Sequence, residues 1–160
     1  MKNKKSQFLE NFFGLRNKKI IITGCSGQLG ECLIDNFLNL GCTVIGIDIQ
    51  KKKNRSKNNF FFYQSDISDY DENAKTFSII FKKFKKIDCL INNAGVAVFK
   101  PFTERVKKDL DWVVDVNLNS YFYSIKNFYK FSDKISNKNV INISSVYSVI
   151  SPDPRIYSKN

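Results

Sequence analysis

Histidine is absent from this sequence of 160 residues. Its absence excludes mechanisms that need an imidazole base and metal sites that need histidine ligands. An acid or base in this chain must therefore be Tyr, Lys, Asp, Glu or Cys. The four cysteines, Cys25, Cys32, Cys42 and Cys89, lack the paired spacing of metal ligands. We expect them to be thiols in a reducing compartment, and we expect no metal site.

Long apolar runs are absent as well. No stretch approaches the ~18 apolar residues of a membrane span, and the basic start at residues 1–5 is not followed by an uninterrupted signal-peptide core. We therefore expect a cytoplasmic protein with no membrane partner.

Acidic residues are few, 15 against 26 Lys and Arg, which gives a net charge of +11. Such an excess could serve nucleic-acid binding. However, the lysines between residues 75 and 86 alternate with apolar side chains at helical spacing, so they form the solvated face of an amphipathic helix. The basic run 51–57 is typical of a polar loop. We expect no nucleic-acid partner.

Apolar runs alternate with amphipathic segments along the chain. The runs predict strands at 19–23, 43–47, 60–63, 87–92 and 139–144. Helices are predicted at 28–40, 71–85 and 109–132, with a shorter one near Glu104. This alternation predicts an α/β fold with a doubly wound parallel sheet in three layers, αβα. We expect a lead-in segment over 1–17 and a single domain over 18–160.

A glycine-rich turn, Thr23–Gly30, joins the first predicted strand to the first helix. Glycines let backbone N–H groups approach an anion, and the helix N-terminus adds partial positive charge. The next strand ends at Asp48, about 20 residues beyond the glycines, where a carboxylate can bind the ribose hydroxyls of a dinucleotide. An acid there repels the extra phosphate of NADP, so we expect NAD, although Lys51–Lys53 weaken that discrimination. Asp48 alone could also be a turn former.

Three further segments suggest a family. They are Asn92-Asn93-Ala94-Gly95, Asp115-Val116-Asn117-Leu118 and Val140-Ile141-Asn142-Ile143-Ser144-Ser145, and they follow the glycine-rich turn in this order. From about Lys18 onward, the chain resembles the short-chain dehydrogenase/reductase family. The resemblance implies a Rossmann-like fold and an NAD-dependent oxidoreductase that transfers hydride between nicotinamide and a carbonyl or secondary alcohol.

The resemblance also implies roles for particular residues. The turn that binds the pyrophosphate would be formed by Thr23, Gly24, Ser26, Gly27, Gln28, Leu29 and Gly30. Asp48 would bind the ribose, Asp66 and Ile67 the adenine, and Asn92, Ala94 and Gly95 would flank the central cleft. Ser145 would hydrogen-bond the substrate and Asn117 would hold a water in a proton relay. Three simpler roles stay open: Asn92 tying strands together, Asn117 bending its helix and Ser145 capping a turn.

The family's catalytic pair, Tyr-x-x-x-Lys, is incomplete here. Tyr157 would need a lysine just past Asn160, and Lys159 lies only two residues away. Alternatively, Tyr157 belongs to a longer loop found in a subgroup associated with surface-sugar or polysaccharide modification. On either reading we expect the amino-terminal portion of a longer enzyme, with its carboxyl-terminal strands missing and this chain inactive alone.

Two other functions remain open. Gln28 replaces a glycine usual in the single-domain branch, which brings the turn closer to the branch of nucleotide-sugar epimerases and dehydratases. A truncated, non-catalytic nucleotide-binding protein is the other alternative. We expect the full-length form to be a homo-oligomer that acts on a small molecule.

Overall fold

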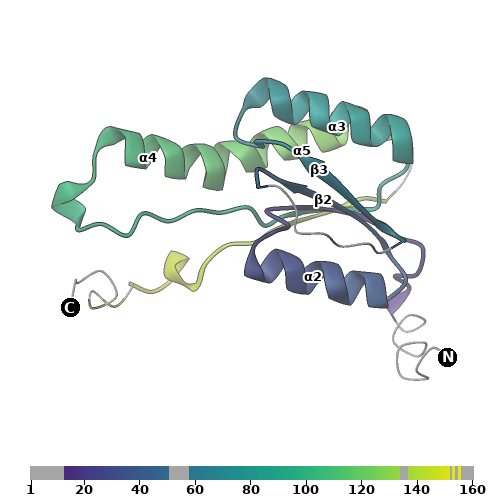
Figure 1. Ribbon diagram of the computed structural model, residues 1–160, viewed down its shortest axis with the longest axis horizontal. Coiled ribbons are helices and arrows are strands. Elements are labelled where there is room, and N and C mark those ends of the chain that lie inside the picture. Colours follow the sequence, from purple (N-terminus) through teal and green to yellow (C-terminus); the bar gives the residue numbers. More distant parts are fainter. Residues whose placement is uncertain (1–12, 51–57, 134–136, 152, 154, 156–160) are drawn as a thin grey trace.

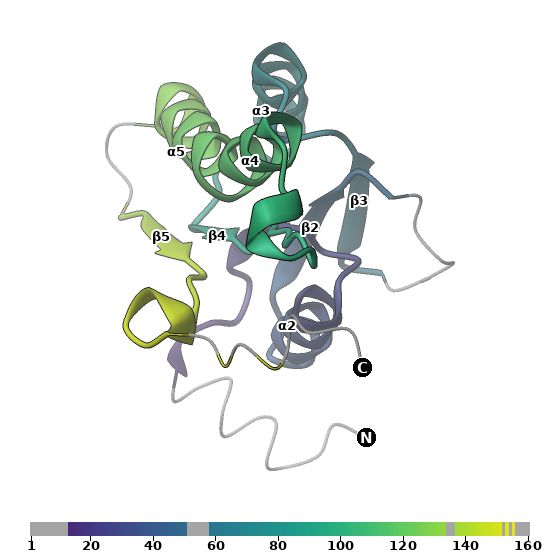
Figure 2. The same cartoon turned by 90° about the vertical axis from the view of Figure 1, so that its left-hand side faces the viewer.

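Five parallel strands form one sheet in the order β3-β2-β1-β4-β5 (Figure 2). The strands are β1 (Lys19–Thr23), β2 (Thr43–Asp48), β3 (Phe60–Gln64), β4 (Cys89–Asn92) and β5 (Asn139–Asn142). The computed structural model describes residues 13–50, 58–133, 137–151, 153 and 155. Most of the predicted lead-in, the basic run 51–57 and Tyr157 lie outside these residues.

Helices cover both faces of the sheet (Figure 1). On one side lies α2 (Gln28–Asn39), and on the other lie α3 (Tyr70–Phe84) and α5 (Ser120–Phe131). The sheet therefore has two cores. Ile21, Phe77 and Phe128 belong to the core under α3 and α5, and Ile22 and Ile34 belong to the core under α2. The prediction of a doubly wound, three-layer α/β fold is confirmed.

The helix predicted at 109–132 consists of three segments. It begins with α4 (Lys107–Val114), passes through a π-helical turn at Asp115–Asn119 and continues as α5. Its apolar periodicity runs through the turn, so the sequence pattern did not reveal the change in hydrogen bonding. The α4 part extends beyond the sheet (Figure 1).

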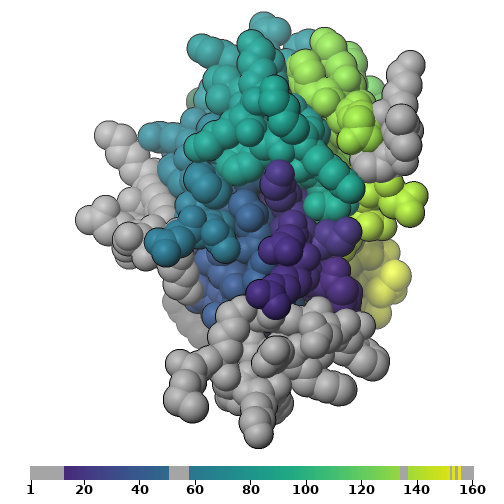
Figure 3. All heavy atoms as spheres, turned by 90° about the vertical axis from the view of Figure 1, so that its right-hand side faces the viewer, coloured from purple at the N-terminus to yellow at the C-terminus, as the bar shows by residue number. Residues whose placement is uncertain are grey.

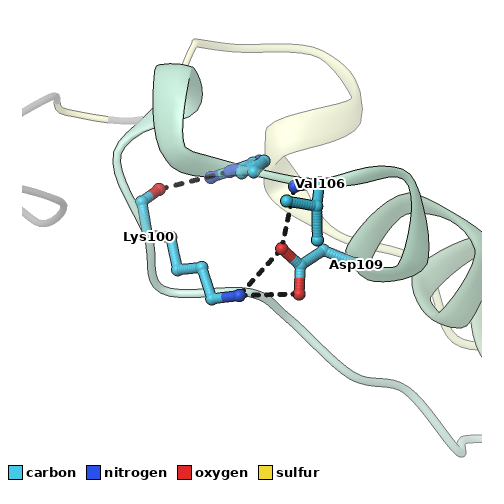
Figure 4. A network of polar contacts seen from close by, with 4 residues as sticks. Lys100, Val106 and Asp109 are labelled. Carbon is cyan, nitrogen blue, oxygen red and sulfur yellow. Dashed lines mark hydrogen bonds and ion pairs between the residues drawn. The ribbon is translucent and has the colours of Figure 1, made fainter.

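The start of α4 is fixed by polar contacts (Figure 4). Asp109 accepts a hydrogen bond from the backbone N–H of Val106 at 3.1 Å, which caps the helix. The same carboxylate accepts from Lys100 Nζ at 2.8 Å. The hydrogen bond from Lys100 holds the pKa of Asp109 below its usual value. This cap explains why the helix begins two residues earlier than predicted.

Two strands are shorter than predicted. β4 begins at Cys89, where its register with β1 starts. The preceding Asp88 accepts hydrogen bonds through its carboxylate from Lys19 N and Lys18 Nζ, at 3.0 Å and 3.2 Å. Figure 3 shows this end of the molecule, with the purple segment that enters β1 between the blue and teal segments. β5 pairs with β4 only as far as Asn142.

Within the described ranges, no helix combines the length and the apolar character needed to cross a bilayer.

Candidate functional site

The chain reverses its direction of winding at the centre of the sheet. From β1 it proceeds outward to β2 and β3, and then returns to β4 on the other side of β1. A crevice forms where the loops after such strands diverge, and open α/β sheets bind ligands there. A cavity of about 520 Å³ lies at this point, within the range of small-molecule sites.

The cavity lining comes from the loops after four strands and from the long helix. Its residues are Gly24, Ser26, Gly27, Gln28, Leu29, Gly30, Ile47, Asp48, Ile49, Gln50, Ser65, Asp66, Ile67, Ser68, Asn93, Ala94, Gly95, Val96, Trp112 and Val116. Eleven predicted cofactor residues are among them. The other two, Thr23 and Asn92, are buried beside the cavity.

Two glycines make the turn after β1 possible. Gly24 has a φ of +62°, and a Cβ atom on it would lie 2.6 Å from Ala94 Cα. A Cβ on Gly30 would lie 2.4 Å from the carbonyl oxygen of Gly24. The turn is therefore tight and sits directly against the loop after β4. Gly27 is the N-cap of α2, so the cavity includes the start of a helix, where anions bind favourably.

Asp48, the last residue of β2, connects two loops. One carboxylate oxygen accepts a hydrogen bond from Ser26 N at 2.8 Å, and the other accepts from Gln50 N at 2.9 Å. Because each carboxylate oxygen has a further lone pair, both can still accept a hydrogen bond from a ligand hydroxyl. The geometry fits a sugar diol next to an anion-binding turn.

The loop after β3 forms a second wall. Asp66 Oδ1 accepts from Ser68 N at 2.9 Å and from Ser68 Oγ at 2.6 Å, which closes a small turn. Ile67 is buried beside it. Asp69 then caps α3 by accepting from Glu72 N at 2.7 Å. This wall combines one apolar side chain with backbone polar groups.

Asn93 holds the loop after β4 against the glycine-rich turn. Its Nδ2 donates to the carbonyl oxygens of Thr23 and Gly24, at 3.0 Å and 2.9 Å. In return, Thr23 Oγ1 accepts from Asn93 N at 3.0 Å and from Ala94 N at 3.2 Å. Asn93 lies within the motif Asn92–Gly95, but no role was predicted for it, because only the fold brings these loops together.

Asn92 lies within the sheet. Its Nδ2 donates to Asn142 Oδ1 at 2.8 Å, which joins β4 to β5. Its own Oδ1 is buried and has no hydrogen-bond partner within the described part of the chain. The side chain therefore makes the strand-to-strand contact that the sequence left open as one of its roles.

Asn117 lies in the π-helical turn, next to the cavity. Its Oδ1 accepts from Val96 N at 2.8 Å and its Nδ2 donates to Val96 O at 2.9 Å. Val96 lines the cavity, and so does Val116, the neighbour of Asn117. The side chain thus fixes the loop after β4 to the long helix. Turns of this π-helical kind are common at functional sites.

Ser145 follows β5 and is exposed. Its Oγ accepts from Tyr147 N at 3.2 Å and caps the 3₁₀ turn Val146–Ser148. Ser145 and Asn117 do not line the cavity formed by the described residues. Tyr157 and Lys159 lie outside those residues.

Tyr121 was not predicted as a site residue. Its hydroxyl lies 3.1 Å from the carbonyl oxygens of both Ala94 and Ile143 and can donate to either. Burial raises the pKa of Tyr121, which favours the neutral phenol that can donate these hydrogen bonds. It therefore connects the loop after β4 with the end of β5. Trp112 and Val116 were missed for a similar reason, since only the packing of the long helix brings them to the cavity.

A glycine-rich turn, an acid at the end of the second strand and a crevice at the switch point are the features of dinucleotide-binding α/β domains. The profile of the short chain dehydrogenase family matches residues 18–158. The chain belongs to the short-chain dehydrogenase family.

Known relatives agree with this assignment. A 3-oxoacyl-(acyl-carrier-protein) reductase of Buchnera aphidicola is 34% identical over 140 residues, covering 83% of this chain and 57% of the relative. A 2-dehydro-3-deoxy-D-gluconate 5-dehydrogenase of Dickeya dadantii is 28% identical, covering 86% of this chain and 57% of the relative.

Solved structures show the same fold. A short chain dehydrogenase from Leptospira borgpetersenii, solved with bound NAD+, is 31% identical with a TM-score of 0.78, over 89% of this chain and 59% of that one. Aldohexose dehydrogenase of Thermoplasma acidophilum is 26% identical with a TM-score of 0.79, over 90% and 56% of the two chains. The chain thus spans less than two thirds of the length of these relatives.

Proposed function

We propose that this chain is the cofactor-binding part of an NAD(H)-dependent oxidoreductase acting on a carbonyl or secondary alcohol. The proposal rests on the position of Asp48. This residue is the last of β2, and it lines the same cavity as the glycine-rich turn. When bound, the nicotinamide would supply hydride to a carbonyl or accept it from a secondary alcohol. The residues of this chain bind and orient the dinucleotide, with the pyrophosphate at the start of α2 and the ribose at Asp48.

The Asp48 carboxylate supports NAD over NADP. Its two oxygens can accept from the 2′- and 3′-hydroxyls of the ribose, whereas a 2′-phosphate would place negative charge beside the carboxylate. The two backbone hydrogen bonds from Ser26 and Gln50 fix the position of the carboxylate. The NAD+ bound to the Leptospira relative is consistent with this preference.

Ser145 and Asn117 are the catalytic residues proposed for the described part of the chain. In the proposal, Ser145 Oγ hydrogen-bonds the substrate oxygen, as its place at the carboxyl end of a strand allows. Asn117 holds a water in the proton relay while its amide stays bound to Val96. Tyr157, or a tyrosine and lysine elsewhere in a longer protein, would transfer the substrate proton.

The substrate class is proposed from the relatives. Several are named as enzymes of sugar derivatives, including a sorbitol-6-phosphate 2-dehydrogenase of Klebsiella pneumoniae and the Thermoplasma aldohexose dehydrogenase. Their names favour a hydroxylated carbonyl or alcohol, in keeping with a role in sugar metabolism. They also favour a dehydrogenase over a nucleotide-sugar epimerase.

Replacement of Asp48 tests the cofactor proposal. Asp48→Ala removes the hydroxyl acceptors, so we expect NADH affinity to fall by about 10- to 100-fold, the order of a lost charge-assisted hydrogen bond. Calorimetric titration measures the dissociation constant. Asp71→Ala is the matched control, because Asp71 is an exposed acid in α3 that does not line the cavity. Equal affinity of Asp48→Ala and the wild type would contradict the proposal.

We further propose that a second copy of the protein covers the outer face of the long helix. Four apolar side chains follow one another there at spacings of four residues, Leu110, Val114, Leu118 and Phe122. Each is at least one third exposed. A contiguous apolar stripe of this kind favours a protein partner.

A further inference from the structure

Two amides and one hydroxyl meet in the core between α3 and α5, away from the cavity. Asn73 on α3 donates from Nδ2 to Ser124 Oγ at 3.0 Å, and its Oδ1 accepts from Asn127 Nδ2 at 3.1 Å. All three side chains are at least 97% buried. Their neighbours in this layer include Phe77 and Phe128, so the site is otherwise apolar. The contacts bind the two helices at a position where apolar side chains would pack as well.

The network also reaches the cavity wall. Asn73 Nδ2 donates to the backbone carbonyl oxygen of Ile67 at 2.9 Å, a contact that is itself buried. Ile67 lines the cavity, whereas Asn73, Ser124 and Asn127 do not. One amide group therefore links the wall after β3 to both α3 and α5.

Two other contacts hold the same wall to α3. Thr76 Oγ1 donates to Ser65 Oγ at 2.9 Å, and Glu72 Oε1 accepts from Asp66 N at 3.0 Å. The Glu72 contact is exposed to solvent, which weakens it through competition with water. Of these contacts, only that of Asn73 reaches a backbone group of the wall from within the core and continues to a second helix.

We infer that Asn73 is a positioning residue for the adenine half of the dinucleotide site. By fixing the Ile67 carbonyl, it sets the position of the wall formed by Ser65–Ser68, and through Ser124 and Asn127 it ties that position to α5. Burying a polar amide costs free energy that an apolar side chain would not incur. We infer that the amide is present because it fixes the position of the wall. The inference rests on the proposed function, which assigns this wall to adenine.

Three forms of the chain test the inference. The double variant Ser124→Ala/Asn127→Leu removes the partners on α5 but keeps the bond from Asn73 to Ile67. The triple variant adds Asn73→Leu, which removes the three polar side chains of the network and takes the donor away from the Ile67 carbonyl oxygen. The unsatisfied carbonyl is expected to cost about 1–3 kcal/mol, less than the total stability of a typical domain, so the triple variant is expected to remain folded. Thermal melting of each variant checks this.

The readout is binding of the two halves of the cofactor. Calorimetry measures NADH and ADP-ribose, and ligand-detected NMR measures nicotinamide mononucleotide, which has no adenine. We expect the triple variant to bind NADH and ADP-ribose about five-fold more weakly, the order of one neutral hydrogen bond. Nicotinamide mononucleotide should bind unchanged. The double variant keeps the bond to Ile67 and loses only the tie to α5, so it should weaken NADH and ADP-ribose binding less than the triple variant does.

The outcomes separate the two proposals. If the wild type does not bind NADH, the proposed function fails and the inference fails with it. If the wild type binds NADH and the triple variant binds it equally well, the proposed function stands and the positioning role is wrong. Equal weakening of ADP-ribose and nicotinamide mononucleotide would also overturn the positioning role, because it would show a general loss of structure.

Discussion

Among the single residues of the site, Trp112 offers a direct way to observe cofactor binding. It is the only tryptophan of the chain and it lines the cavity from α4. Tryptophan emission overlaps the absorption of NADH, so a bound nicotinamide within the cavity should quench it by energy transfer. We expect saturable quenching of Trp112 by NADH and its loss in Trp112→Phe. Binding seen by calorimetry without any change in emission would contradict the assignment of the cavity.

Gly24 and Gly14 allow a matched comparison of the same substitution at two positions. Both have positive φ, +62° and +60°, but an added Cβ clashes only at Gly24, where Ala94 Cα would be 2.6 Å away. Gly14→Ala should lose about 1 kcal/mol of unfolding free energy through backbone strain. Gly24→Ala should lose about 2–4 kcal/mol, because the loop after β4 must also move. Denaturant unfolding measures both, and equal losses would show that the close approach is unimportant.

At the scale of elements, the long helix is connected to the sheet by Tyr121. Its hydroxyl can donate a hydrogen bond to the carbonyl oxygen of Ala94 or of Ile143. Tyr121→Phe removes this bond and should lower the unfolding free energy by about 1 kcal/mol. Because burial raises the pKa of Tyr121, the unfolded chain releases this proton at lower pH than the folded chain. The stability is therefore complete below the ordinary tyrosine pKa of about 10 and is lost as the pH rises through the raised value.

Urea unfolding at pH 7 and at alkaline pH checks this prediction. The difference between the wild type and Tyr121→Phe should shrink at high pH. A difference that stays constant, or no difference at pH 7, would be incompatible with the bridging role.

The elements themselves could be predicted from sequence because they depend on local patterns. Buried strands such as 19–23 are apolar runs, and α3 shows its buried face through Phe77, Phe81 and Phe84. The number of residues between the glycine-rich turn and Asp48 is set by the length of one βαβ unit, so this pair could also be recognised from the sequence. The π-helical turn at Asp115–Asn119 was missed because side-chain periodicity does not report backbone hydrogen bonding.

The missed site residues have a common cause. Asn93, Trp112 and Tyr121 gain their roles from segments far away in the sequence, such as the carbonyls of Thr23 and Ile143. No local pattern identifies such partners. Asn73 is similar, because a polar residue on the apolar face of a predicted helix has no explanation until α5 packs against it.

At the scale of the whole molecule, the apolar stripe along α4 and α5 leads to a prediction about assembly. Phe122→Glu places a charge in the stripe, where Phe122 is 63% exposed, so it should convert an oligomer to monomers. Ile79→Glu is the control, because Ile79 is also exposed, at 44%, but lies on α3 and is not one of the four residues of the stripe. Sedimentation equilibrium gives the mass. A monomeric wild type, or an unchanged mass for Phe122→Glu, would show that no second copy binds there.

We propose that the cavity between the loops after β1 and β4 holds NAD(H), and that Asp48 selects it over NADP(H). The most direct test is a parallel titration of the wild-type chain with NADH and NADPH. We expect saturable binding of NADH at least about ten-fold tighter than that of NADPH, or about 1.4 kcal/mol. Equal or tighter binding of NADPH would contradict the role of Asp48, and absence of binding by the folded chain would contradict the assignment of the cavity itself.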